Sequence, residues 1–257
     1  MSEHPGLSPQ QRQRLHQLVE RGVLTAVETW ARRMTAPTWW RATEGGPSPY
    51  QGGTVCFVHT GARVIGVTAE HVHRKAVDRS TNEWCQVGAH TFDPVTRCID
   101  ADPELDLCTY DFTEVSTNAA NADVHHAPVW PPRAVDGDPA LACGWPWELS
   151  SEEGHQATHR FLHFLCRIQQ HSPTQLGIAT FTSTSVPWGS SPLPKGTRLG
   201  GMSGGPVYRI VESPLSQLHL VGIVYEYQPN FELMLARPLS LINSDGTIDR
   251  SSRKADA

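Results

Sequence analysis

The spacing of hydrophobic residues predicts a helix near the start of the chain. Between Leu15 and Met34, hydrophobic side chains recur mostly at steps of three and four, which is the spacing of one helix face. Ser8 and Pro9 precede this stretch and form a typical helix start, a capping residue followed by proline in the first turn. We expect an amphipathic helix that packs on the outside of the main domain. The alternative is an arm that binds a partner protein.

After about residue 50 the pattern changes to short β-strands. Runs rich in Val, Ile, Phe and Thr alternate with turn residues, which is typical of a sandwich or barrel. A proline-rich segment at 127–139 separates two groups of such runs and is typical of a linker. The pattern predicts an all-β protein with a helical extension at 1–48, β halves at about 49–127 and 138–245, and a flexible tail at 246–257.

Composition narrows the classes of partner and compartment. The net charge of −5 favours neither nucleic acid nor an anionic membrane surface as a partner. No apolar run approaches the roughly 20 residues needed to span a bilayer, and the N-terminal residues lack the apolar core of a signal peptide. We expect a cytoplasmic protein whose six cysteines are buried free thiols. The alternative is an exported protein with one or two disulfides.

The segment GGMSGGPVY at 200–208 carries the clearest chemical signal. Glycines on both sides of Ser203 suit a nucleophile on a tight turn, because small neighbours let a substrate carbonyl approach the backbone. The N–H groups of Gly201 and Ser203 could then stabilise an oxyanion. By itself, this segment could equally be an ordinary glycine-rich turn.

Two further segments supply a base and an acid. The apolar strand VIGVTA is followed by His71 after one intervening residue, and Asp106 stands immediately before the alternating run LCTYDF. Both side chains would be held by the ends of strands. Asp100, Asp102 and Asp111 compete with Asp106 but do not stand at the start of an apolar strand.

Together these motifs resemble the chymotrypsin-like (trypsin-like) serine peptidases, and in particular their bacterial members, over roughly residues 50–240. The family's T-A-x-H motif falls on His71, its aspartate-led strand on Asp106, and its G-x-S-G-G-P motif on Ser203. CGWP at 143–146 resembles the entry strand of the second barrel, and LVGIVYEY at 220–227 resembles the edge strand that pairs with substrate.

The resemblance implies two packed six-stranded antiparallel β-barrels, with the active site in the crevice between them. It implies a triad of Ser203, His71 and Asp106, an oxyanion hole made by the amides of Gly201 and Ser203, and no cofactor or metal. The expected substrate is a protein or peptide. Two alternatives are a catalytically silent binding module and a protease subunit of a larger bacterial signalling or defence assembly.

Several residues depart from the family pattern. Met202 replaces the aspartate that binds a new N-terminal amine in members activated by cleavage. Thr197 occupies the expected base of the specificity pocket, which does not support a preference for Arg or Lys. Tyr225 and Tyr227 flank Glu226 in the expected substrate-binding strand, and Tyr227 replaces a glycine that keeps the pocket open. Glu70, beside the base, is expected to face solvent.

The numerous histidines raise the question of a metal site. His155, His159 and His163 would line one face of a helix, but their segment is expected to be a strand without a pocket. His73, two residues after His71, is expected to be a solvated neighbour.

Overall fold

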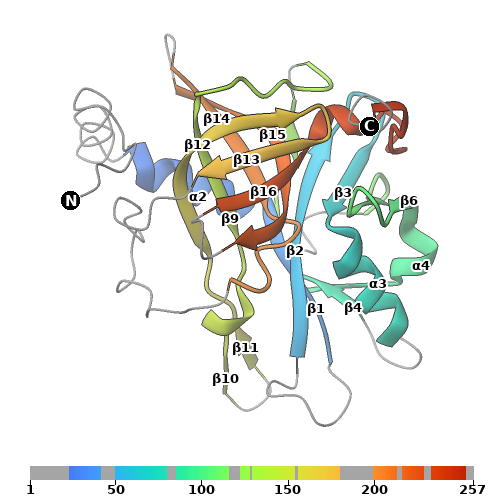
Figure 1. The fold of residues 1–257 in the computed structure, drawn as a ribbon. Coiled ribbons are helices and arrows are strands. Elements are labelled where there is room, and N and C mark those ends of the chain that lie inside the picture. The colour runs from blue at the N-terminus through green and yellow to red at the C-terminus, as the bar shows by residue number, and fades with distance from the viewer. Residues whose placement is uncertain are drawn as a thin grey trace.

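Two β-sheets make up most of the molecule, and both are antiparallel in nearly every pairing (Figure 1). The structure, a computed structural model, describes residues 23–41, 50–79, 85–115, 122–127, 129–153, 156–179, 199–212, 216–228 and 233–252. None of the helices within these ranges is long and apolar enough to cross a lipid bilayer.

The first sheet has eight strands and is open. Its path runs β5-β4-β1-β2-β3-β7-β6, and β8 pairs with β2 in parallel. No pairing between the described strands closes this path, so the first sheet forms a half-barrel. Together with the closed barrel of the second sheet, it gives the predicted double-barrel architecture. The strands are β1 (Thr35–Arg41), β2 (Tyr50–His59), β3 (Val64–Thr68), β4 (Cys85–Val87), β5 (His90–Phe92), β6 (Cys98–Asp102), β7 (Leu107–Asp111) and β8 (His125–His126).

The second sheet closes into the predicted six-stranded antiparallel barrel, in the order β12-β13-β16-β15-β14-β9. A separate hairpin, β10–β11, and two 3-10 turns, η2 and η4, lie beside it. The bounds are β9 (Pro139–Gly144), η2 (Trp147–Leu149), β10 (Ser151–Glu153), β11 (Gln156–Thr158), β12 (Leu162–Ser172), β13 (Gln175–Ala179), β14 (Pro206–Glu212), β15 (Ser216–Gln228), β16 (Leu233–Pro238) and η4 (Leu239–Leu241).

The space between the two sheets is filled by a shared hydrophobic core. Val58 and Val67 of the first sheet pack in one cluster with Leu141 and Ile223 of the barrel, and all four side chains are buried. Burial of apolar surface contributes about 25 cal/mol per Å², so this cluster holds the halves together as one body.

Three helices are described, α2 (Val23–Arg33), α3 (Glu70–Arg79) and α4 (Pro94–Arg97). The predicted packing of the N-terminal helix on the main domain holds for α2. Ala31 is fully buried in the shared core, and the Trp30 ring meets the Tyr208 ring edge-on with centroids 5.0 Å apart. Residues 1–22, which include the predicted helix start at Ser8, lie outside the described residues.

Strand β1 corrects the expected boundary of the helical extension. It lies inside the range 1–48 and pairs with both β2 and β4. Ala36, Thr38 and Trp40 are buried at alternate positions, which is the period of a strand. Pro37 obscured this alternation in the sequence, because proline lacks the N–H that a strand interior normally donates.

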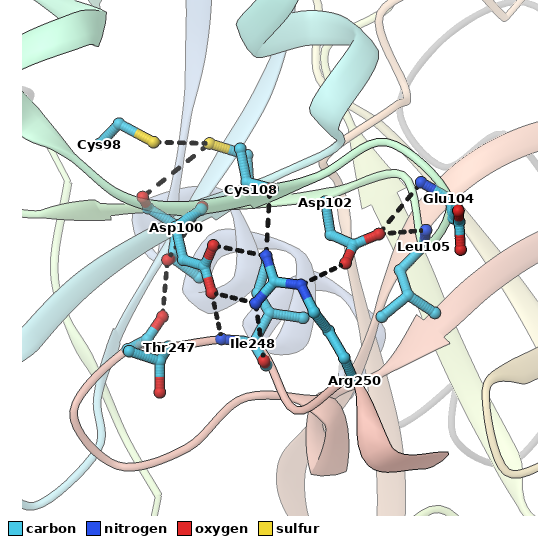
Figure 2. A network of polar contacts seen from close by, with 12 residues as sticks. Cys98, Asp100, Asp102, Glu104, Leu105, Cys108, Thr247, Ile248 and Arg250 are labelled. Carbon is cyan, nitrogen blue, oxygen red and sulfur yellow. Dashed lines mark hydrogen bonds and ion pairs between the residues drawn. The ribbon is translucent and has the colours of Figure 1, made fainter. Parts of the chain in front are cut away.

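The C-terminal segment corrects the expectation of a flexible tail from residue 246. Ile248 forms a bridge with Ile242, and its N–H donates to Asp100 at 2.9 Å. Figure 2 shows the Arg250 guanidinium between two carboxylates of β6, at 2.7 Å and 2.8 Å from the Asp100 oxygens and 2.8 Å from Asp102. The polar sequence hid this contact, because its partners stand about 150 residues earlier in the chain.

Candidate active site

His71 and Asp106 form a two-point hydrogen-bonded pair. His71 is the second residue of α3, directly after β3, and Asp106 ends the turn between β6 and β7. The His71 backbone N–H donates to Oδ1 of Asp106 at 2.8 Å, and its ring Nδ1 lies 2.8 Å from Oδ2. Burial by itself would raise the pKa of Asp106, but the hydrogen bonds and charge of His71, with the charge of Arg237, hold it below its ordinary value. The pair therefore fixes the imidazole next to an ionised carboxylate.

The turn that carries Asp106 is held from two sides. Asp106 has a φ of +48°, the one positive value of a non-glycine residue among those described. The Asp102 carboxylate accepts the N–H groups of Glu104 at 3.0 Å and Leu105 at 2.9 Å (Figure 2). Arg237 of β16 donates to the carbonyls of Leu105 and Glu104. These contacts offset the strain of the left-handed conformation.

The Ser203 loop precedes β14 of the second barrel and contacts β2 of the first sheet. Gly204 has a φ of +86°, and a Cβ there would lie 1.9 Å from the Thr54 carbonyl oxygen, so only glycine fits. Thr54 of β2 donates its hydroxyl to the Gly201 carbonyl at 2.8 Å and its N–H to the Ser203 carbonyl at 2.9 Å. The loop is thereby fixed by a residue of the opposite half of the molecule.

Gly53 lies between the start of α3 and the Ser203 loop. A Cβ on Gly53 would be 2.7 Å from a methyl group of Val72 and 3.0 Å from the Ser203 carbonyl oxygen. Val72 directly follows His71, so the helix that carries the imidazole and the loop that carries the hydroxyl approach one another at this glycine. Residues of three separate motifs thus come to one region of the molecule.

The polar groups of the Ser203 loop differ in their hydrogen bonding. The Ser203 hydroxyl donates to the Tyr225 carbonyl at 3.3 Å, and the Met202 N–H donates to Leu199. Within the described part of the chain, the N–H groups of Gly201 and Ser203 have no hydrogen-bond acceptor.

Comparison with known proteins adds evidence on the fold. No protein-family model and no curated protein matches the chain. A solved structure of a serine endoprotease from Yersinia pestis aligns with 83% of this chain at 14% sequence identity and a TM-score of 0.50. The chain has the chymotrypsin-like fold. It spans 63% of the length of the Yersinia pestis chain. A protease from M. tuberculosis in its active form aligns with 84% of this chain and 81% of its own at 13% identity and a TM-score of 0.42.

The residues expected to bind substrate lie in different surroundings in this chymotrypsin-like fold. Thr197 lies outside the described residues. Tyr225 is half-buried, and the Arg237 guanidinium lies 4.1 Å from its ring centroid. Tyr227 packs against the core of the second barrel. Strand β15 pairs with β14 from Ser216 to Ile223 and with β16 from Gly222 to Gln228, so beyond Val224 its only described strand partner is β16.

Sequence reasoning missed three residues that support the site, and it misjudged a fourth. Thr54, Arg237 and Arg250 carried no motif, because their partners are distant in the chain. Glu70 was expected in solvent, but its side chain is buried and lies 3.5 Å from Arg74. Burial raises the pKa of Glu70, and the Arg74 charge opposes that rise.

The remaining histidines do not form the helical metal face considered earlier. His163 lies within β12, as the strand prediction required, and burial lowers its pKa to about 4. His159 contacts Ser150 at 3.0 Å, and His155 lies outside the described residues. His73 is half-buried rather than solvated. Its Nδ1 lies 3.0 Å from the Tyr110 hydroxyl, and burial lowers its pKa.

Proposed function

We propose that this chain is a serine endopeptidase that hydrolyses peptide bonds through Ser203, His71 and Asp106. The observation that carries the proposal is the two-point pair between His71 and Asp106, positioned beside the Ser203 loop at Gly53. A base oriented by a carboxylate and adjacent to a hydroxyl is the arrangement that activates a serine nucleophile.

The proposed reaction proceeds by acyl transfer. Because Nδ1 of His71 is bonded to Asp106, Nε2 is the nitrogen that takes the Ser203 proton as Oγ bonds to the substrate carbonyl carbon. The imidazolium then donates this proton to the leaving amine as the C–N bond breaks. Water, deprotonated by the same nitrogen, hydrolyses the acyl-enzyme and restores the serine. Asp106 stays ionised throughout and stabilises the imidazolium.

The Gly201 and Ser203 amides are the proposed oxyanion donors. Their N–H groups would stabilise the negative charge that develops on the carbonyl oxygen as the tetrahedral intermediate forms. Losing one such donor typically lowers turnover by about 10²–10³. Thr54 is the proposed support of this pair, since it bonds the carbonyls of the same two residues.

The proposed substrate is an extended segment of a protein or peptide. The last residues of β15, beyond Val224, have a side that no described strand occupies. An extended peptide could add to this edge through backbone hydrogen bonds, which is a common mode of peptide recognition. The proposed chemistry uses only side chains and backbone amides of this chain.

Covalent labelling with a fluorophosphonate probe tests the proposal. The wild-type protein should be labelled at Ser203 and should cleave members of a peptide library. We expect Ser203→Ala to abolish labelling and to lower turnover at least about 10³-fold, and Asp106→Asn to lower it about 10⁴-fold. Ser244→Ala, at an exposed serine, is the matched control and should behave as wild type. Cleavage that persists in a folded Ser203→Ala variant would exclude Ser203 as the nucleophile.

One observation favours a second candidate, a binding module that does not cut. The Ser203 hydroxyl donates to the Tyr225 carbonyl, so in this state its proton is directed away from His71. In a silent module this bond would persist, and the probe would leave a folded protein unlabelled while peptides still bound. In the proposed enzyme, rotation about one side-chain bond of Ser203 turns the hydroxyl to the imidazole.

A further inference from the structure

A cluster of two cysteines and one histidine lies beside the candidate active site without a role in the proposed reaction. It consists of His73 on α3, Cys98 on β6 and Cys108 on β7. One donor atom from each side chain lies within 4.8 Å of the other two. Cys98 and His73 are partly exposed, whereas Cys108 is buried, so the cluster is open to solvent on one side.

We propose that His73, Cys98 and Cys108 bind a zinc ion. Two thiolates and an imidazole form a donor set that Zn²⁺ prefers over the harder cations calcium and magnesium. The Sγ atoms of Cys98 and Cys108 lie 3.9 Å apart (Figure 2). Zinc–sulfur bonds of about 2.3 Å in a tetrahedron place two sulfurs about 3.8 Å apart, so the observed spacing is already that of a zinc site.

The geometry fits a metal better than a disulfide. A disulfide would require the two sulfurs to approach to about 2.05 Å, and it would leave His73 outside the bond. Zinc with two thiolates and a neutral imidazole carries no net charge, so a partly buried site has a small desolvation cost. Three protein donors leave one tetrahedral position for a water molecule.

The surroundings of the cluster are also those of a metal site. The Tyr110 hydroxyl lies 3.0 Å from Nδ1 of His73 and contacts the Cys108 thiol, so it can orient both donors. Partners of this kind fix the direction of metal ligands. A register shift in β6 between Cys98 and Asp100 allows Cys98 to leave the regular strand geometry.

A metal at this position would tie α3, which carries His71, to β7, which begins directly after Asp106. His73 is two residues after His71 on α3, and Cys108 is two residues after Asp106 on β7. Zinc would therefore stabilise the first sheet near the candidate site while taking no part in the acyl transfer. The zinc proposal and the peptidase proposal can fail independently of one another.

Metal content and cobalt substitution test the site. We expect native mass spectrometry of the whole chain, with its cysteines reduced, to show one bound zinc per chain. The cobalt form should show a sulfur-to-cobalt charge-transfer band, which a site made of histidines alone would lack. Cys98→Ser should lower zinc affinity more than about 100-fold, because even loss of a group that only orients a ligand costs about 10–100-fold. Zinc should raise the melting temperature of the wild type and leave that of Cys98→Ser unchanged.

Matched variants separate this site from others in the molecule. Cys98 is partly exposed, so its serine variant is expected to fold, and His73→Gln provides a second test with the same expected loss. Cys166→Ser, in the second barrel, should retain full zinc binding, since a serine hydroxyl can keep the bond to the Ala140 carbonyl. The proposal is overturned if Cys98→Ser binds zinc as the wild type does, if cobalt binds without sulfur ligation, or if the wild type binds no zinc.

Discussion

Arg250 links the C-terminal segment to the turn that positions Asp106, and its removal gives a quantitative test of the structure. The guanidinium bonds both oxygens of Asp100 and one of Asp102, at 2.7–2.8 Å (Figure 2). The Asp102 side chain is only 2% exposed, and its other oxygen accepts two N–H groups of the turn before Asp106. Arg250→Ala would leave two partly or wholly buried carboxylates without their cation.

The expected cost follows from this burial. Removing one member of a buried ion pair typically costs about 3–5 kcal/mol, because the remaining charge is left uncompensated. Arg250 is itself 45% exposed, so water can reach part of the vacated space and reduce the cost. We therefore expect Arg250→Ala to lower the free energy of unfolding by about 2–4 kcal/mol. The matched control is Arg63→Ala, whose pair with Asp111 is longer at 3.4 Å and whose carboxylate is 40% exposed, against 2% for Asp102. It should cost less than about 1 kcal/mol.

Urea unfolding, monitored by tryptophan fluorescence, measures the free energy of unfolding of both variants. The denaturant slope m should be the same in all of them. A double-mutant cycle with Asp102→Asn isolates the pair, since asparagine keeps an oxygen for the two turn N–H groups. Arg250→Ala should cost about 1–3 kcal/mol less in the Asp102→Asn background than in the wild type. Equal losses for Arg250→Ala and Arg63→Ala would refute the reasoning, and so would a cycle with no coupling.

Three further predictions concern other parts of the molecule. Thr54→Val should lower the free energy of unfolding by about 2–4 kcal/mol, because the Gly201 carbonyl and the Trp145 N–H lose the hydroxyl that they bond. It should also lower peptide turnover at least about tenfold. Thr60→Val, a buried threonine remote from the serine loop, should lose stability without this loss of turnover. Gly204→Ala should lower the free energy of unfolding, measured with urea, by about 3 kcal/mol or more, since a Cβ would lie 1.9 Å from a carbonyl oxygen. A decrease of less than about 1 kcal/mol would contradict this. His163 has a pKa of about 4 in the folded protein and 6.5 in the unfolded chain, so the unfolded chain takes up its proton first as pH drops. This histidine should therefore lower the free energy of unfolding by about 1.4 kcal/mol per pH unit between pH 6.5 and 4, and His163→Gln should remove this contribution.

Local patterns in the sequence predicted the parts of the structure that depend on neighbouring residues. Alternation of apolar and polar positions predicted the strands of the second barrel, and a helical period predicted α2. Motifs singled out His71, Asp106 and Ser203, and the structure brings the first two together. These signals are readable in one dimension because a strand or a helix imposes its own period on the residues that form it.

Contacts between distant segments could not be predicted in this way. The hydrogen bond of Thr54 to Ser203 spans about 150 residues, as does the ion pair of Arg250 with β6, and neither Thr54 nor Arg250 stands in a motif. The polar sequence of the C-terminal segment indicated a tail, because only tertiary packing supplies the carboxylates that its arginine neutralises. The burial of Glu70 likewise depends on tertiary packing, which the local sequence does not show.

The sequence by itself therefore determined which side chains are the candidates for peptidase chemistry and which stretches form strands. The tertiary structure decided which contacts hold those side chains in place and that His73, Cys98 and Cys108 meet. The physical reason is that backbone periodicity is a local property, whereas the position of a side chain in space depends on the packing of every element between it and its partner.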